Sequence, residues 1–174
     1  MPFDLDKSLP ILERTPYVVD AMLRGLPEQS IRATEGPNTW SPFDIVGHLI
    51  HGEKTNWIPR LEMILAEDGP HHFAPFDRTA MFKDSEGKSL DDLVEEFISL
   101  RASNVGRLKS ADLTGSDFQK TGIHPEFGEV TLAQLLSAWT AHDLDHISQI
   151  ARVLAKQHYD AVGPWAAYLR ILRT

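Results

Sequence analysis

The chain has 174 residues, of which 42% are hydrophobic, and a formal net charge of −8. A chain of this size and apolar content can bury a core without disulfides, and we expect a single domain over residues 1–174. It contains no cysteine, which excludes disulfides, catalytic thiols and thiolate metal ligands. The acidic balance disfavours nucleic acid and anionic membranes as partners, because both need concentrated positive charge.

The N-terminus lacks the features of a secretory signal. It carries two acids, Asp4 and Asp6, and has no small-residue cleavage site. No apolar stretch approaches the roughly 20 residues that a membrane-spanning helix needs. We therefore expect a cytoplasmic protein.

Two helices are predicted in the N-terminal part of the chain. The first covers about residues 5–25, and Pro10 and Pro16 are expected to break or kink it. The second covers about residues 42–66, and Pro59 is expected to bend it because proline removes one backbone hydrogen bond.

Helices are also predicted at about 89–109 and 131–156, with a short one near 162–172. The segments 67–88 and 110–130 are rich in Gly, Pro, Asp and Ser, which is typical of connections. The alternation that marks strands is absent over any useful length. The sequence therefore predicts an all-α fold, a four-helix bundle with two crossover connections plus a short C-terminal helix.

Three of these helix starts carry a capping box, in which a Ser or Thr is followed three residues later by an acid or amide. The three pairs are Ser41 with Asp44, Ser89 with Asp92, and Thr131 with Gln134. Pro42 also occupies the first helical position of the first of them, where its missing N–H costs nothing.

The run His142-Asp143-Leu144-Asp145-His146 holds the clearest candidate site. Two histidines four residues apart project from one face of a helix, and Trp139 and Gln149 fall on the same, largely apolar face. Asp143 and Asp145 flank that face, which favours a solvated or helix-pairing role for them, although either could orient another group.

His48 is the third candidate ligand, from the predicted helix 42–66. It shares a face with Ile45 and Gly52, so it also belongs to the core side of its helix. His51 lies about 60° further round and is an alternative ligand or a supporting group. If the two helices face each other, His48, His142 and His146 form an open metal site. From spacing alone, metal binding and ordinary core packing are equally favoured.

Two further features bear on the chemistry. His124 lies in a predicted loop and is a candidate for lining a pocket mouth. Asp143 stands where zinc proteases of the His-Glu-x-x-His type have glutamate, and its shorter side chain disfavours a metalloprotease.

Several motifs along nearly the whole chain resemble the DinB-like superfamily, which includes the YfiT-like metal-dependent hydrolases. These are Leu12-Glu13-Arg14-Thr15-Pro16, Trp40-Ser41-Pro42 leading into His48, Gly128-Glu129-Val130-Thr131-Leu132, the His142–His146 run followed by Gln149, and Val162-Gly163-Pro164-Trp165.

The resemblance implies a four-helix bundle that binds a divalent cation through His48, His142 and His146. It implies Zn²⁺ or Ni²⁺ and a homodimer, and iron or manganese are further candidates for the ion. Some members transfer low-molecular-weight thiols such as bacillithiol or mycothiol, so a small-molecule substrate, including such a thiol, is expected. One scaffold can host several reactions, and thiol transfer and hydrolysis both stay open.

Two other functions are compatible with the sequence. One is a non-catalytic helical module with a structural metal, whose apolar surface binds a partner or a second copy. The terminal segment would supply that surface, although such stripes usually pack inward as core: Trp165, Tyr168, Leu169, Ile171 and Leu172. The other is binding of haem or another flat ligand by His48 and the pair His142 and His146.

Overall fold

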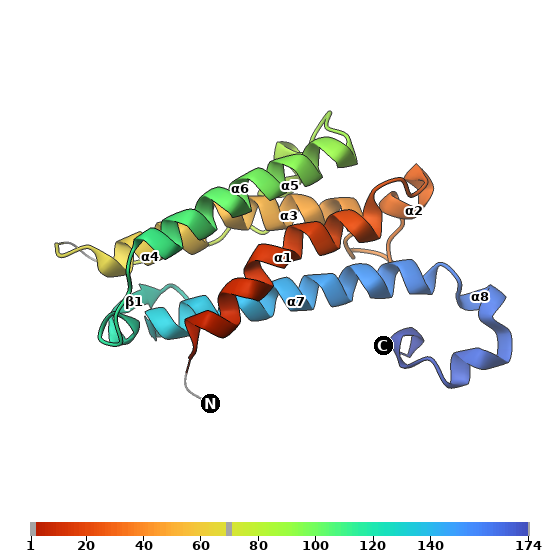
Figure 1. The fold of residues 1–174 in the computed structure, drawn as a ribbon. Coiled ribbons are helices and arrows are strands. Elements are labelled where there is room, and N and C mark those ends of the chain that lie inside the picture. Colours follow the sequence, from red (N-terminus) through yellow and green to blue (C-terminus); the bar gives the residue numbers. More distant parts are fainter. Residues whose placement is uncertain (1–2, 69–70, 174) are drawn as a thin grey trace.

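Four long helical segments form the bundle in a computed structural model, which describes residues 3–68 and 71–173. They are α1 (Leu5–Leu23), α3 (Pro42–Thr55) continued by α4 (Trp57–Leu65), α6 (Leu90–Ser110) and α7 (Leu132–Lys156). Figure 1 shows that α3–α4 and α6 run in one direction while α1 and α7 run in the other. The four-helix bundle predicted from the sequence is therefore confirmed.

Shorter elements fill the connections. Helix α2 (Glu28–Arg32) joins α1 to α3, and α5 (Ala80–Asp84) lies in the long return from α4 to α6. The connection from α6 to α7 holds the short 3-10 helix η1 (Asp117–Gln119) and a hairpin of β1 (Thr121–His124) and β2 (Gly128–Thr131). The hairpin corrects the expectation that strands are absent, because a pair this short has too little alternation to be recognised in sequence.

The predicted helix starts at Ser41, Ser89 and Thr131 are confirmed. In each capping box the hydroxyl accepts a hydrogen bond from the backbone N–H three residues on, and that residue's side chain accepts from the cap's own N–H. These boxes fix where α3, α6 and α7 begin.

Pro10 and Pro16 do not break their helix, whereas Pro59 lies just after an interruption in its own. Helix α1 runs through Pro10 and Pro16 without ending. Pro16 cannot donate to the carbonyl of Leu12, and the guanidinium of Arg101 donates to that buried oxygen instead, at 2.8 Å. Pro59 does more than bend its helix, because α3 ends at Thr55 and α4 begins at Trp57.

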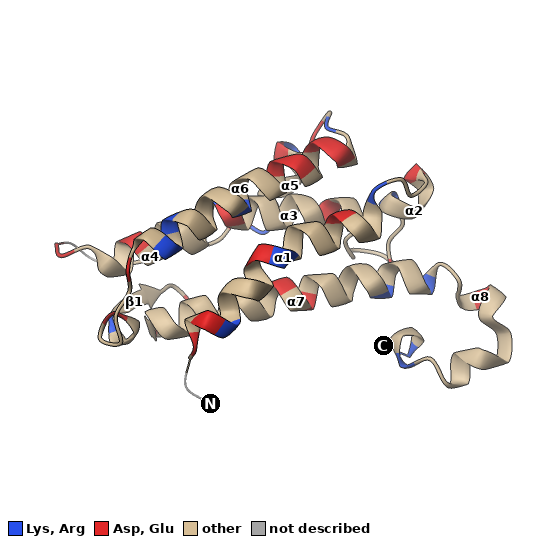
Figure 2. Cartoon of the chain, viewed as in Figure 1, with Lys and Arg blue, Asp and Glu red and all other residues tan. Residues whose placement is uncertain are grey.

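The core has two parts along the bundle axis. One is centred on Val19, Ile45, Leu49, Phe97 and Ile150, and the other on Leu12, Ile58, Leu61, Leu136 and Trp139. Lys and Arg are interspersed with Asp and Glu along the helices (Figure 2). None of the helices within the described ranges is apolar over a length that would cross a bilayer.

The C-terminal segment leaves the bundle after α7 and turns back as α8 (Tyr159–Val162) and the 3-10 turns η2 (Gly163–Ala167) and η3 (Arg170–Leu172) (Figure 1). Only Leu172 of its large apolar residues is buried, while Trp165 is 69% and Tyr168 83% exposed. The interpretation of this segment as core is wrong, because its turns are too short to present one continuous apolar face.

Candidate metal centre

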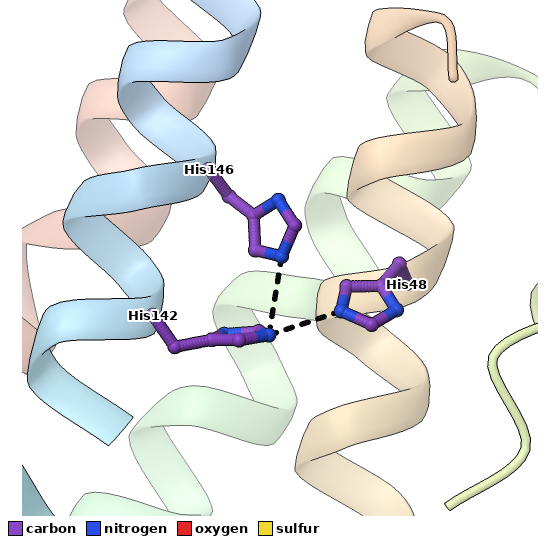
Figure 3. A group of neighbouring side chains, drawn as sticks. All are labelled: His48, His142 and His146. Carbon is purple, nitrogen blue, oxygen red and sulfur yellow. Dashed lines mark hydrogen bonds between the residues drawn. The ribbon is translucent and has the colours of Figure 1, made fainter. Parts of the chain in front are cut away.

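Three histidines from two helices meet in the middle of the bundle. His48 comes from α3, and His142 and His146 come from successive turns of α7. The Nε2 atom of His142 lies 3.0 Å from Nε2 of His48 and 3.1 Å from Nε2 of His146 (Figure 3). One ring nitrogen of each histidine lies within 4.8 Å of the other two. We call His48, His142 and His146 the histidine cluster.

Burial keeps the cluster neutral. Loss of hydration lowers the pKa of His48 to about 3 and that of His142 to about 2, and the neighbouring imidazoles add to both shifts. Loss of hydration also lowers the pKa of His146, although Gln149 and two nearby carboxylates oppose it. All three rings are therefore uncharged at neutral pH, the form in which imidazole binds a metal.

Protons alone cannot satisfy the three Nε2 atoms. A neutral ring nitrogen carries either one proton or one lone pair, so His142 Nε2 has one group to offer to two neighbours. A cation solves this, because each nitrogen can direct its lone pair at the same point. Zn–N bonds of 2.0–2.1 Å in a tetrahedral site place ligand nitrogens about 3.3 Å apart, close to the spacing here. The donor set therefore fits a divalent ion.

Of the three Nδ1 atoms of the cluster, one has a hydrogen-bond partner that leaves its Nε2 free for a metal. His146 Nδ1 lies 2.8 Å from Oε1 of Gln149, so the ring donates its Nδ1 proton there and leaves Nε2 free for a metal. The Nδ1 atoms of His48 and His142 are buried and have no partner within the described residues. Gln149, which shares a helical face with His142 and His146, therefore fixes the orientation of the His146 ring.

Aromatic rings hold the cluster in place. Trp40 packs over His48 with ring centres 4.7 Å apart and lies 6.1 Å from His146. The edge of Phe76 meets His48 at 5.4 Å, and Trp57 meets His142 at 5.1 Å. These contacts restrict ring rotation, so the ligand nitrogens are preorganised.

A pocket of about 840 Å³ opens beside the cluster. We call it the central pocket; its walls come from α3–α4, α7, the hairpin and the segment before α5. The residues that line it include His48, Gly52, Asn56, Arg60, Phe73, Phe76, Arg78, His124, Glu126, Glu129, Leu135, Ala138, His142, Asp145 and His146. A small molecule that enters it can reach all three histidines.

Of the other candidate residues, His124 lines the central pocket, whereas His51 and Trp139 do not. His124 ends β1 and lines the central pocket, where its Nδ1 accepts from the backbone N–H of Glu126 at 3.1 Å. His51 lies outside the cluster, with its Nδ1 3.5 Å from a carboxylate oxygen of Asp84. Trp139 is fully buried and stacks on Trp57 rather than lining the pocket.

Of the two roles that the sequence favoured for Asp143, the structure excludes the solvated one and agrees with helix pairing. It is fully buried, not solvated, and both its oxygens accept hydrogen bonds from Arg101, at 2.5 and 3.0 Å. Arg101 also donates to Glu53 at 2.8 Å, and Trp139 Nε1 donates to the same glutamate at 3.2 Å. Asn104 donates to the other Glu53 oxygen at 3.0 Å. The network formed by these residues lies behind the cluster and joins α3, α6 and α7.

The comparisons with known proteins agree with this architecture. The family model of the DinB superfamily matches residues 11–150, and the chain belongs to that superfamily. No curated protein matches the sequence significantly. Among solved structures, the chain resembles YfiT from Bacillus subtilis, described as "a probable metal-dependent hydrolase with an unusual four-helix bundle topology". The two are 22% identical, with a TM-score of 0.76 over 87% of this chain and 86% of YfiT.

Proposed function

We propose that this protein is a metal-dependent enzyme that acts on a small molecule in the central pocket. His48, His142 and His146 are the proposed ligands of a divalent cation, Zn²⁺ or Ni²⁺ first. The observation that carries the proposal is the convergence of three neutral imidazoles on one point beside a pocket of about 840 Å³. A bound cation supplies Lewis acidity there and makes a coordinated group more acidic.

Two reactions are candidates, hydrolysis and the transfer of a low-molecular-weight thiol. Asp145 lines the pocket beside the cluster and is exposed, so it is a carboxylate that can accept a proton from a reacting group. The chain has no cysteine, so a transferred thiol must come from a second small molecule. The pocket also offers a substrate apolar contacts in either reaction, from Phe73, Phe76 and Leu135.

The first experiment measures metal content. We expect purified protein to carry about one divalent ion per chain, and His146→Ala to lose most of it because one of three ligands is removed. His51→Ala is the matched control, since His51 sits on the same helix as His48 but outside the cluster. Equal metal content in His146→Ala and the wild type would reject the site.

A second experiment separates the two reactions. Metal-loaded protein is incubated with bacillithiol, mycothiol or glutathione and monochlorobimane, and conjugation is followed by fluorescence. Metal-dependent acceleration with one of these thiols supports transfer. Acceleration of ester or amide hydrolysis without a thiol supports the hydrolase, and inactivity in both assays favours a structural metal.

Homodimer formation is a separate proposal, which we place at the C-terminal segment. Trp165, Tyr168 and Leu169 line an exposed apolar groove there, and apolar surface of this kind is typical of contacts between proteins. We expect light scattering to give the mass of a dimer for the wild type and a smaller mass for Tyr168→Ser. A monomeric wild type would exclude the dimer.

A further inference from the structure

One wall of the central pocket is a row of residues spaced by four along α3 and α4. His48, Gly52, Asn56 and Arg60 all line the pocket, so the row leads from the cluster to an arginine. Although the helix is interrupted at Asn56, the N–H of Asn56 donates to the oxygen of Gly52 at 3.0 Å and the N–H of Arg60 donates to the oxygen of Asn56 at 3.1 Å, so the four-residue steps continue across the interruption. Arg60 therefore lies about three helical turns along this wall from His48.

Arg60 is buried without an acidic partner. It is 8% exposed, and its Nη2 donates to the backbone oxygen of Ala74 at 3.1 Å. Its guanidinium lies 4.9 Å from the centre of the Phe73 ring. In residues 3–68 and 71–173, no carboxylate oxygen lies within 4.0 Å of its nitrogens. Loss of hydration lowers its pKa accordingly.

Arg101, which does not line the central pocket, shows how this fold pairs a buried arginine. It is 1% exposed, and it pairs with two carboxylates, those of Asp143 and Glu53. Arg60 has no such pair, although burying an unpaired charge is costly. An arginine that lines a ligand pocket and has no carboxylate partner in the chain can bind an anionic group of a ligand.

The charge around Arg60 favours a single negative charge on that ligand. Three exposed carboxylates line the same pocket, those of Glu126, Glu129 and Asp145, against one further arginine, Arg78, and this excess of acidic side chains disfavours a dianion. Midway along the wall, the buried Oδ1 of Asn56 has no partner within the described residues and can accept a hydrogen bond. The planar guanidinium matches a carboxylate, to which it can donate two parallel hydrogen bonds.

We propose that Arg60 binds a carboxylate of the substrate, and that the substrate is an elongated monoanion whose opposite end reaches the histidine cluster. The inference rests on the proposed function, because the cluster defines the reacting end. It adds a substrate class and assigns Arg60 to substrate recognition rather than to the reaction itself.

The test uses cobalt-loaded protein and thiol probes of matched length. Mercaptohexanoate and mercaptohexanol both place a sulfur on the cobalt, which is seen as a thiolate charge-transfer band, and they differ only in the carboxylate. We expect mercaptohexanoate to bind the wild type about tenfold more tightly or better, the strength of one charge-assisted contact. Mercaptohexyl phosphate should bind more weakly than the carboxylate. Equal affinity for the acid and the alcohol, or tighter binding of the phosphate, would overturn the proposal.

Variants locate the effect. Arg60→Gln should lose the preference for the acid while its affinity for the alcohol and its cobalt content stay unchanged. Arg78→Gln is the control, because Arg78 lines the same pocket but is exposed. If Arg60→Gln fails to fold, Arg60→Lys keeps the charge and should show a reduced preference. A full preference in a folded Arg60 variant contradicts the assignment.

The design separates this inference from the proposed function. A wild type that takes up no cobalt would defeat the metal site. Hexanoate alone then reports on Arg60 through the fluorescence of Trp57, which also lines the pocket. Quenching by hexanoate in the wild type that is lost in Arg60→Gln supports the anion site. No quenching in the wild type rejects the anion site.

Discussion

His142 shows how burial and geometry together define the candidate site. Its Nε2 faces two other imidazole nitrogens at 3.0 and 3.1 Å, and its surroundings favour the neutral ring. A histidine that only filled the core would need one hydrogen-bond partner. Here three Nε2 atoms face one another, and a shared cation can bind the lone pair of each.

The pKa shifts make the stability of the metal-free protein depend on pH. Above about pH 6.5, His48 and His142 are neutral in both the folded and the unfolded chain. Below pH 6.5 these histidines become protonated in the unfolded chain but stay neutral in the folded chain. This difference persists down to the folded pKa, which is about 3 for His48 and about 2 for His142. We expect the free energy of unfolding to fall by about 1.4 kcal/mol per pH unit for each histidine.

Urea unfolding with a chelator, at several values between about pH 7 and 5, measures this slope. His142→Leu should flatten it, and His72→Gln, which changes an exposed histidine, should leave it unchanged. An identical slope in His142→Leu and the wild type would refute the assigned cause.

Sequence spacing placed His142 and His146 on one face but left metal binding and core packing equally favoured, and it did not predict the contacts of Arg101 and Arg60. His142 and His146 share a helix, so their common face follows from the period of the helix. Arg101 is separated from Asp143 by 42 residues and from Glu53 by 48, and no local pattern links them. The position of Arg60, three four-residue steps after His48, was a local signal that could have been used.

The hairpin, like the short helices α2 and α5, was not predicted from local patterns, and it forms one wall of the pocket. Residues 71–73 add to its edge, with the N–H of Phe73 donating to the oxygen of Ile123 at 2.9 Å and the N–H of Ile123 donating to the oxygen of His71 at 2.7 Å. Phe73 then covers Gly122. These contacts join segments about fifty residues apart in the sequence, so local sequence patterns could not predict them.

Gly122→Ala tests this packing. A Cβ at Gly122 would lie 2.6 Å from the Phe73 ring, and the strand or the ring must move. We expect a loss of about 1–3 kcal/mol in the free energy of unfolding, the usual cost of overpacking. Gly115→Ala, in the same connection but with open space around it, should change stability by less than about 0.5 kcal/mol. Equal stability of the two variants would show that the contact is unimportant.

The boundary between the helices α3 and α4 also shapes the pocket. Pro59 cannot donate to the oxygen of Thr55, and the helix is interrupted at Asn56 between them. The sequence predicted a bend at Pro59, whereas in the structure the helix is interrupted at Asn56. That break leaves the Asn56 side chain in the pocket wall.

At the scale of the whole molecule, Arg101 joins the four helical segments of the bundle. It donates to Leu12 on α1, Glu53 on α3 and Asp143 on α7 from its own place on α6. The network leaves two carboxylates dependent on one buried cation.

Arg101→Gln should therefore lower the free energy of unfolding by about 3–5 kcal/mol, because it leaves buried charge without a partner. Arg107→Gln is the matched control on the same helix, where an exposed ion pair with Glu62 contributes about 1 kcal/mol or less. Chemical denaturation measures both. A loss in Arg101→Gln no larger than that of the control would contradict the role given to the network.

The proposed enzyme requires a cation bound by the histidine cluster. An anomalous-difference map from crystals of the zinc-loaded protein, measured on both sides of the zinc edge, tests this directly. We expect one strong peak within about 2.0–2.2 Å of Nε2 of His48, His142 and His146. A map with no peak there, or with its strongest peak at other residues, would contradict the proposed metal site.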